Sequence, residues 1–585
     1  MIGRLEKALL GVACGALAVR GILSLDGTMW LWGLNAQRFL PVALGWGLWS
    51  VCAVSCVSSV SISIARGLER LGASLQTRAS ARVGFALLIG TIVFLLDDRT
   101  WFVGDFLIRR MGGSNAFRGS FLQSLPLERW LIGTGPTLVA SLLPAPTYYR
   151  VLSAIATFVL AMAAVRLGRD VAISPIAIAV SASTVTLGGW LVVATGLAKT
   201  AAILCALTAA VASFVSPRLM NWSSMAKCGI AVSLAIFLHR GGVLLLPCWA
   251  LALVHTVRNE KPTLSTRGVR HLASALLPLI AGLVSFSELW RIFTNYDLPH
   301  HLGGQPTLGP GQWWTLSALP LRVLDVINLA LFLLPALPVL VIAASSFRPG
   351  TADFSRWQRL SMLAVPWIGA VLLIRPGQGV FRDVDVFAPA GIAVGALLAL
   401  ATSNGIAAAS KGRLAAIVST SLLVATVQIL LVEHSSAAGL DRVAAYASGP
   451  PQRTNAEIGM TWDFLALRSF AVRDWPRAAS ATNAAVRYEP SPRILIMRGI
   501  ANTYVGEYRT ARDSYSEALR VDNHLPEAWL GLAGAAAYLE DKALEDSALA
   551  SLIRLGAYEQ TRPIIQKLRT EFPAVYPASA SPIPW

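Results

Sequence analysis

The feature that most constrains this chain is a long series of apolar stretches of membrane-spanning length between residues 8 and 433. A helix needs about 20 apolar residues to cross the hydrocarbon core of a bilayer, and fewer where neighbouring helices shield its ends. We therefore expect a polytopic transmembrane helix bundle of about 11–13 spans. The candidate spans are residues 8–25, 39–64, 83–97, 148–167, 172–188, 191–215, 226–239, 242–257, 271–288, 318–344, 358–374, 386–402 and 413–433.

The charge of the chain is divided unevenly. The 585 residues carry 49 Lys+Arg and 32 Asp+Glu, a net charge of +17, and only 14% are charged, against about 25% in soluble domains. Residues 434–585 hold 16 basic and 16 acidic residues, so the whole excess belongs to residues 1–433. Nucleic-acid binding requires basic residues on an exposed face, which excludes it here. The pattern indicates a membrane protein with a neutral, water-soluble C-terminal part.

The basic residues also predict the orientation of the chain, because cytoplasmic loops carry an excess of Lys and Arg. With the N-terminus in the cytoplasm, every expected inside segment is basic; the clusters are Arg4/Lys7, Arg66/Arg70/Arg78/Arg82, Arg166/Arg169, Arg218/Lys227, Arg258/Lys261/Arg267/Arg270, Arg348/Arg356/Arg359 and Lys411/Arg413. An odd number of spans then places the C-terminal part outside, and an even number places it in the cytoplasm. We expect a bacterial inner membrane protein with a periplasmic C-terminal part.

Four charged clusters fall on the opposite, outer face. In chain order they are Asp97, Asp98 and Asp105, followed by an amphipathic helix at 106–111; His239-Arg240; the loop 289–317 with Asp297, His300, His301 and Trp313-Trp314; and Arg375 with Arg382, Asp383 and Asp385. Charges at membrane depth are costly and usually face a cavity or a partner. We expect these clusters to converge on a polar substrate.

Each cluster also allows a structural interpretation. The alternatives are helix capping or pairing with Arg99 for Asp97 and Asp98, an ion-pair cluster for Arg382, Asp383 and Asp385, a bond to a backbone carbonyl for His239, ordinary loop positions for His300 and His301, and an interfacial anchor for Trp313-Trp314. The shared face of the four clusters, rather than any single motif, favours the functional interpretation.

Residues 83–433 resemble the GT-C superfamily of integral-membrane glycosyltransferases, in particular multi-span bacterial members that end in tetratricopeptide repeats. The motifs that carry the resemblance are Phe102-Val103-Gly104-Asp105, Ile236-Phe237-Leu238-His239 followed by Val243-Leu244-Leu245-Leu246-Pro247, Arg322-Val323-Leu324-Asp325-Val326-Ile327-Asn328, and Arg382-Asp383-Val384-Asp385-Val386-Phe387-Ala388-Pro389. The chain departs from the family in its two extra spans, within residues 1–82, and in Val384, where relatives often have Trp.

The resemblance implies transfer of a sugar from a polyprenyl-phosphate or polyprenyl-diphosphate carrier to an extracytoplasmic acceptor. A carboxylate in the first large outer loop then acts as general base, which implies Asp105 or Asp98. Our candidates for the phosphate are Arg240, Arg375 and Arg382, because guanidinium groups bind phosphate oxygens bidentately. The other substrate-binding candidates are Asp97, His239, Asp383 and Asp385. The last two residues could hold a divalent metal, but many GT-C enzymes need none, and we assign no cofactor.

The C-terminal part shows a helical repeat of about 33 residues over residues 470–572, typical of a tetratricopeptide (TPR) solenoid. The recurring positions are Ala478 and Ala485 with Ala511 and Ala518, a weaker third copy at Ala543 and Ala550, Trp475 with Tyr508, and Gly499 with Gly531. We expect a linker at 434–469 that includes a partial helix at 455–470, and a disordered tail at 573–585. The solenoid is either a docking surface for a protein or glycan partner or a passive cap.

The sequence therefore predicts a membrane glycosyltransferase that uses an aspartate general base. One alternative is a transporter or flippase of a lipid-linked substrate, which would place charges at mid-membrane and contain inverted repeats. Another alternative is a non-catalytic cell-envelope assembly scaffold that recruits partners through the repeats.

Overall fold

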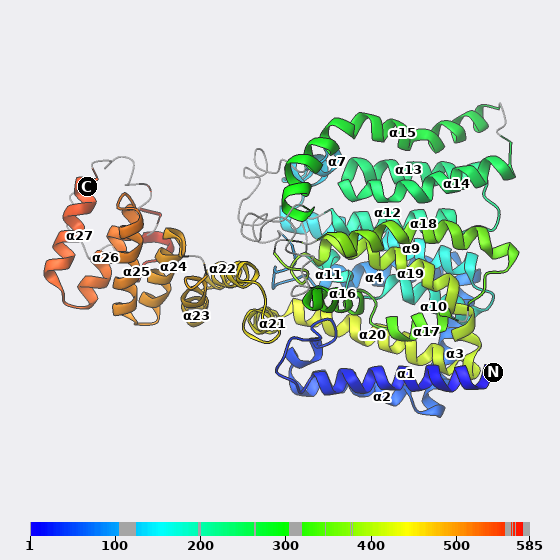
Figure 1. Ribbon diagram of the computed structural model, residues 1–585, viewed down its shortest axis with the longest axis horizontal. Helices are drawn as coiled ribbons and strands as arrows, with labels where there is room; N and C mark the ends of the chain where they lie inside the picture. Colours follow the sequence, from blue (N-terminus) through cyan, green and yellow to red (C-terminus); the bar gives the residue numbers. More distant parts are fainter. Residues whose placement is uncertain are drawn as a thin grey trace. The chain divides into compact units, whose positions relative to one another are not determined.

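The computed structural model describes the chain except for residues 1, 105–123, 197–199, 262–264, 303–318, 346, 375, 377, 489, 556–562, 564–565, 568 and 577–585. The described residues form helices and connecting turns, without a β-strand among them (Figure 1). The predicted all-α class is therefore confirmed. The chain divides into two compact units, Met1–Arg442 and Val443–Trp585.

The first unit is a helix bundle. Its elements are α1 (Ile2–Leu23), η1 (Ala36–Phe39), α2 (Val42–Ser55), α3 (Ser58–Thr77), α4 (Ala79–Leu95), α7 (Pro126–Glu128), η2 (Arg129–Thr134), α8 (Gly135–Leu138), α9 (Ala145–Val171), α10 (Pro175–Thr186), α11 (Leu191–Thr195), α12 (Ala201–Val215), α13 (Trp222–Leu238), η3 (Arg240–Leu245), α14 (Leu246–Asn259), α15 (Thr266–Ile292), η4 (Phe293–Leu302), α16 (Leu319–Leu333), α17 (Leu337–Ser345), α18 (Thr351–Leu373), α19 (Val384–Ala408), η6 (Ala409–Gly412) and α20 (Arg413–His434), and α21 (Ser436–Ser448) begins at its end.

Within the described residues, four helical segments are long and apolar enough to cross a membrane: Ala145–Val171, Arg240–Asn259, Thr266–Pro299 and Val384–His434. The number rises to six if two bent pairs, α2 with α3 (90°) and α16 with α17 (93°), each count as one span. Shorter apolar helices are Ala79–Leu95, Pro175–Thr186, Ala201–Val215 and Trp222–Leu238.

This number is smaller than the number of spans expected from the sequence, because several expected spans are bent, broken or short. The expected span 318–344 bends between α16 and α17, where Pro335 lacks a backbone N–H to continue the helix. The expected span 191–215 is divided between α11 and α12. A membrane bundle is thus supported by length and composition, and the figure of about 11–13 spans stays a prediction.

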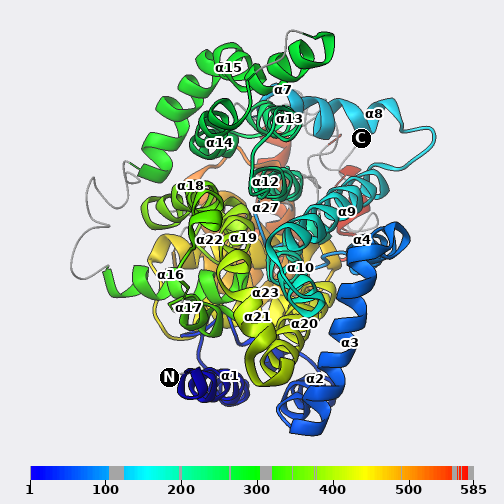
Figure 2. The ribbon, with the colours of Figure 1, turned by 90° about the vertical axis from the view of Figure 1, so that its right-hand side faces the viewer.

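The helix α12 lies in the middle of the bundle, packed against α9, α13, α18 and α19 (Figure 2). At the periphery, α15 exposes large apolar side chains: Leu283 is 78% exposed, Val284 65% and Phe286 64%. An apolar surface of this kind requires a partner or a lipid environment. The outer helices therefore fit a lipid environment.

The C-terminal end of α12 is held by buried arginines from α18. Arg359 donates hydrogen bonds to the carbonyls of Val215 (2.8 Å) and Pro217 (2.6 Å). Arg356 donates to the carbonyl of Asp170 at the end of α9 (2.7 Å). Helix C-termini carry unpaired carbonyls and partial negative charge, which a guanidinium satisfies. Two arginines that mark the expected cytoplasmic side therefore also cap helices.

The second unit consists of three consecutive helix pairs: α22 (Asn455–Val472) with α23 (Trp475–Ala485), α24 (Pro492–Tyr504) with α25 (Tyr508–Val521), and α26 (Pro526–Tyr538) with α27 (Lys542–Arg554). Each pair turns at one residue in the left-handed conformation, namely Arg473 (φ 59°), Gly506 (φ 84°) and Glu540 (φ 60°). These turns are spaced 33 and 34 residues apart. The described helix pairs thus recur with the spacing expected from the sequence.

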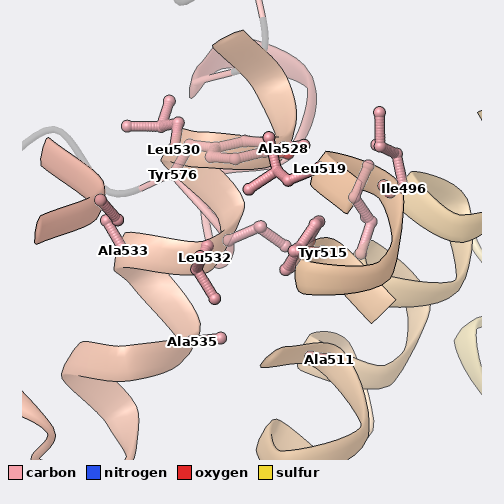
Figure 3. Close-up of a cluster of buried hydrophobic side chains, with 14 of the residues drawn as sticks. Ile496, Ala511, Tyr515, Leu519, Ala528, Leu530, Leu532, Ala533, Ala535 and Tyr576 are labelled. Carbon is pink, nitrogen blue, oxygen red and sulfur yellow. The ribbon is translucent and has the colours of Figure 1, made fainter. Parts of the chain in front are cut away.

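Tyr515 of α25 lies between the neighbouring helices α24 and α26 (Figure 3). A Cβ atom on either Gly499 or Gly531 would lie 2.5 Å from atoms of the Tyr515 ring. The two glycines are not equivalent positions of the repeat, because they lie at different distances from the turns at Gly506 and Glu540. Their recurrence in the sequence reflects two contacts with one tyrosine ring.

The third copy of the repeat has a different register from the one expected. Ala543 and Ala550 are exposed, whereas Ala548 and Leu552 are buried. The reason is the spacing of the turns: Ala543 comes only three residues after Glu540, so it falls on another face of its helix than the alanines that begin the other copies.

The segments expected to be irregular are partly ordered. In the expected linker at 434–469, α22 confirms the helix expected at 455–470, whereas α21 was not expected. In the expected disordered tail at 573–585, Val575 and Tyr576 are only 1% and 2% exposed, and residues 577–585 lie outside the described part of the chain. Composition predicted a flexible end here, but two apolar side chains in the tail pack into the core of the unit.

Candidate functional site

Asp98 follows α4 and is built into a tight turn. Its carboxylate Oδ1 accepts hydrogen bonds from the backbone N–H groups of Thr100 (2.8 Å) and Trp101 (3.0 Å), and Trp101 has a φ of 64°. The backbone N–H of Asp98 donates to the carbonyl of Thr195 in α11 at 3.0 Å. Aspartate side chains commonly bond to backbone N–H groups two residues on and stabilise turns. The buried Asp98 side chain therefore fixes the path of the chain out of α4.

Asp97 connects the same turn to the end of α20. Its Oδ1 atom lies 3.5 Å from Nε of Arg99 and 3.3 Å from Nδ1 of His434. The carbonyl of Glu433 accepts hydrogen bonds from the backbone N–H groups of Arg99 (2.9 Å) and Thr100 (3.2 Å). The pairing of Asp97 with Arg99, which the sequence allowed as a structural alternative, is thus present.

The segment after Asp98 lies against the segment before α19. The backbone N–H of Gly104 donates to the carbonyl of Arg382 at 2.7 Å, and Gly104 has a φ of 68°, a conformation that favours glycine. The guanidinium carbon of Arg382 lies 5.8 Å from the centre of the Phe102 ring, within the range of a cation–π contact. Arg382 and the neighbouring Asp383 are both buried. The structure therefore brings together the first and the last of the four charged clusters.

The N-terminal end of α12 connects these clusters with two further parts of the site. Gly196, directly after α11, faces the side chain of Asp98: a Cβ on this glycine would lie 3.1 Å from the Cβ of Asp98. The buried Asp385 lies in the first turn of α19, which packs against α12. A Cβ on Gly241 in η3 would lie 3.4 Å from Leu204.

His239 and Arg240 follow α13 at this end of the bundle. The Nδ1 atom of His239 accepts a hydrogen bond from the backbone N–H of Gly241 at 3.0 Å and so caps η3. The Nε atom of Arg240 lies 3.0 Å from Oδ1 of Asp297, and its guanidinium carbon lies 5.5 Å from the ring centre of Tyr296. His239 and Arg240 are thus joined to η4, which lies in the segment 289–317 that the sequence predicted as a loop. The charge of Arg240 is balanced by the carboxylate of Asp297.

A cluster of aromatic rings and one ion pair, which the sequence did not predict, lies beside these segments. The indole of Trp32 lies 4.9 Å from the ring of Phe381 and 5.8 Å from that of Phe332, measured between ring centres. The guanidinium carbon of Arg442 lies 4.7 Å from the Phe381 ring centre. Arg442 also forms a buried ion pair with Glu433 (3.1 Å) and donates to the carbonyl of Trp32 (2.9 Å).

This Trp32–Arg442 cluster joins the ends of four helices and segments that are far apart in the sequence. Burial lowers the pKa of the Arg442 guanidinium, and the carboxylate of Glu433 opposes that shift. Because Phe102 and Phe381 are also neighbours, with ring centres 5.2 Å apart, the cluster supports the contact between residues 102–104 and Arg382. The only sequence signal for it was the opposite charge of Glu433 and Arg442 nine residues apart.

Asn328, the last residue of one resemblance motif, also has a structural role. Its buried side chain accepts a hydrogen bond from the backbone N–H of Gly33 (2.9 Å) and donates to the carbonyl of Trp30 (2.8 Å). A Cβ on Gly33 would lie 2.2 Å from the carbonyl oxygen of Asn328, so only glycine permits this approach. Asn328 thus anchors the segment after α1 to α16.

Several expected site residues lie outside the described part of the chain: Asp105, Arg375, the helix expected at 106–111 and Trp313-Trp314. For His300 and His301 only the backbone is described. Among the described residues, no group of three or more His, Cys, Asp or Glu side chains is arranged to hold a metal ion.

We compared the chain with protein-family models, curated protein sequences and solved structures, and none of them matches it.

Proposed function

We propose that this chain is a membrane glycosyltransferase of the GT-C type that transfers a sugar from a polyprenyl-phosphate donor to an acceptor on the outer side of the membrane. The observation that carries the proposal is the hydrogen bond from Gly104 to the carbonyl of Arg382. This contact holds Gly104 against the backbone of a buried arginine, and in the sequence the candidate base Asp105 is the residue after Gly104. A base for the acceptor and a cation for the leaving phosphate are the two groups that such a transfer needs.

We assign the general base to Asp105 and a positioning role to Asp98. Asp98 already accepts two backbone hydrogen bonds in its turn and packs beside Gly196, so its geometry serves the path of residues 98–104. In the proposed reaction, the acceptor hydroxyl oxygen attacks the anomeric carbon while its proton passes to the carboxylate of Asp105. The bond from that carbon to the phosphate oxygen of the carrier breaks, and the oxygen keeps the bonding electrons.

We assign the stabilisation of the leaving phosphate to Arg382, with Arg375 as the second candidate. Arg382 lies beside Phe102 and Gly104, whereas Arg240 is engaged by Asp297. A guanidinium binds two phosphate oxygens at once, which favours the growing negative charge in the transition state. The apolar carrier tail would lie among the outer helices, whose exposed leucine, valine and phenylalanine side chains suit lipid contact.

A transporter would use charges in the middle of its spans. Arg20 is the charge that the sequence places within a span, but it lies three residues before the end of α1 and donates to Oε1 of Gln428 at 2.5 Å. This pairing gives Arg20 a structural role between α1 and α20. We therefore favour the enzyme, and we place its N-terminus in the cytoplasm of a bacterial cell.

For the second unit we propose a TPR-like fold that serves as a docking surface. The observation in favour is the recurrence of left-handed turns at Arg473, Gly506 and Glu540, at the spacing of a TPR repeat.

The proposal is tested by comparing three variants in membrane vesicles: Asp105→Asn, Asp98→Asn and, as a matched control, Glu69→Gln, which alters an exposed carboxylate in α3. The assay measures transfer of sugar from a panel of tritium-labelled polyprenyl-phosphate hexoses and pentoses. We expect Asp105→Asn to be made in normal amounts and to lose about 100-fold or more in initial rate, the usual contribution of a general base.

Asp98→Asn should instead lower the amount and thermal stability of the protein, because an amide is a weaker acceptor for the two backbone N–H groups. Full activity of Asp105→Asn would show that another group is the base. If the unaltered chain transferred no sugar from any donor of the panel, the glycosyltransferase proposal would be wrong.

A further inference from the structure

Residues 572–576, the last described residues of the chain, lie across the helices of the second unit itself. Val575 and Tyr576 belong to the hydrophobic core formed by α24, α25, α26 and α27. Both residues contact α26, the first helix of the third pair. A Cβ on Gly534 in α26 would lie 2.7 Å from the carbonyl oxygen of Val575, and the Tyr576 hydroxyl donates to the carbonyl of Glu527 at the start of α26 (3.3 Å). The segment thus runs along α26 in the opposite direction to the helix.

Two tyrosine hydroxyl groups bind the backbone of this segment at Ala574. The hydroxyl of Tyr538, at the end of α26, donates to the carbonyl of Ala574 at 2.8 Å. The hydroxyl oxygen of Tyr504, at the end of α24, faces the backbone N–H of Ala574, a contact that favours the ionised form of the hydroxyl. The two hydroxyl groups thus engage both the acceptor and the donor of one backbone residue.

The rings of both tyrosines are held by stacking. Tyr504 stacks on Trp475 with ring centres 3.9 Å apart and planes 4° apart, and Tyr538 stacks on Tyr508 with values of 4.4 Å and 8°. In each stack the partner is the second residue after a left-handed turn, and it belongs to the preceding helix pair. The repeat itself therefore positions both hydroxyl groups, which we call the tyrosine clamp.

The side chains of the segment supply apolar contacts on both sides of the clamp. The ring of Phe572 lies 6.0 Å from that of Phe470 and 6.2 Å from that of Trp475, measured between centres. On the other side of Ala574, Val575 and Tyr576 are buried, whereas Pro573 and Ala574 are exposed. Residues 572–576 therefore present an aromatic residue, two exposed positions, a β-branched residue and a second aromatic residue.

We propose that the tyrosine clamp and the apolar sites beside it form a peptide-binding surface that the chain's own residues 572–576 occupy, so that a partner protein binds by presenting an extended segment with the same pattern and displacing them. Backbone carbonyl recognition together with pockets for selected side chains is a general way to bind an extended peptide. The three helix pairs are joined by their own turns, so release of residues 572–576 requires none of these pairs to be undone. This inference is independent of the proposed enzyme activity.

Tethering makes the chain's own segment a strong competitor, because a covalently linked ligand acts at an effective concentration of about millimolar. Removal of the segment should therefore expose the surface to a peptide in solution. The test uses the full membrane protein in detergent, the same protein ended at Glu571, and a fluorescein-labelled peptide with the sequence of residues 569–578.

We expect the shortened protein to bind the peptide and the complete chain to bind it about tenfold or more weakly, as measured by fluorescence anisotropy. In the shortened protein, Tyr504→Phe with Tyr538→Phe should abolish this binding, because both hydroxyl groups that contact the peptide backbone are lost while the stacked rings stay. Tyr488→Phe, at an exposed tyrosine of the same unit, is the matched control and should bind as the parent does.

Three results would overturn the proposal. Equal binding by the complete and shortened proteins would show that residues 572–576 do not compete. Unfolding of the second unit in the shortened protein, seen as loss of helical circular dichroism, would show that the segment is an integral part of the core. A dimer of the complete chain that disappears on shortening would show that the segment is exchanged between two copies.

Discussion

Helix α15 in the first unit and helix α25 in the second differ in which side chains they bury and which they expose. Most buried residues of α15 are small, among them Gly268, Ala275 and Ser285, and most of its large apolar side chains are exposed. In α25 the buried face includes Tyr515 and Leu519, and the remaining face carries charged residues. Small residues at the contact are typical of helices that pack in lipid, where burial of large apolar side chains brings no gain from the hydrophobic effect.

The difference implies that the two units are stabilised by different interactions. In the first unit, buried polar groups such as Glu433, Arg442 and Arg359 hold helix ends and connections together. In the second unit, ring and alanine packing between helix pairs supplies most of the contacts. Four experiments test this comparison, in order of decreasing expected effect.

The largest effect is expected for Glu433→Gln in the first unit. The substitution removes the negative charge beside the buried guanidinium of Arg442, and a buried pair that loses one partner is destabilised by about 3–5 kcal/mol. The measurement is thermal unfolding in detergent, with Asp463→Asn as control, because its partner Arg493 is half exposed and such pairs contribute about 0–1 kcal/mol. Equal shifts for the two variants would mean that the buried pair contributes no more than an exposed one.

A smaller effect is expected for Arg359→Met, which leaves the carbonyls of Val215 and Pro217 without their donor. Hydrogen bonds to a charged group contribute about 1.5–3 kcal/mol, and we expect a loss of this size in the same unfolding assay. Arg348→Met, at an exposed arginine of the preceding connection, is the control. If both substitutions changed the orientation of the protein but not its stability, the role of Arg359 would be topological only.

Replacing one glycine by alanine in each unit should change the free energy of unfolding in opposite directions. Gly531→Ala places a Cβ against the ring of Tyr515 and should destabilise the second unit by about 1–3 kcal/mol, as overpacked cores do. Gly84→Ala in α4 meets no atom within 4 Å, and it should stabilise the first unit by up to about 1 kcal/mol through helix propensity. The free energies of unfolding of both variants would show this, and a shared sign would contradict the comparison.

The smallest effect is expected for Tyr508→Leu, which keeps an apolar side chain but removes the ring stacked on Tyr538. Aromatic pairs add about 0.5–1.5 kcal/mol beyond their buried area. The substitution should therefore lower the stability of the second unit by about this amount, whereas Tyr488→Leu, at an exposed position, should be near neutral. An unchanged stability of Tyr508→Leu would show that the stacks orient the tyrosine clamp without stabilising the unit.

Features that depend on local residue patterns could be predicted from the sequence. The apolar stretches gave the helical class and most helix positions, such as the expected span 413–433 and α20. The small residues that recur about every 33 positions predicted the period of the second unit. The third copy was placed in the wrong register because Ala543 and Ala550 follow the second copy by 32 residues, whereas the turns at Gly506 and Glu540 are 34 residues apart.

The candidate site was predictable only in part. The sequence selected Asp98, Arg382, Asp383 and Asp385, and the structure places them around the start of α12 and the segment at Gly104. The capping role of Asp98 and the pairing of Arg240 with Asp297 depend on side-chain distances that no spacing rule gives.

By itself, the sequence determined that this chain has a basic, apolar part and a neutral part with repeats, because composition and period are properties of the chain alone. Only the tertiary structure decided that Trp32, Phe381 and Arg442 form one cluster and that residues 572–576 lie on the tyrosine clamp. The physical reason is that such contacts join segments tens to hundreds of residues apart, and their stability depends on the geometry of each contact.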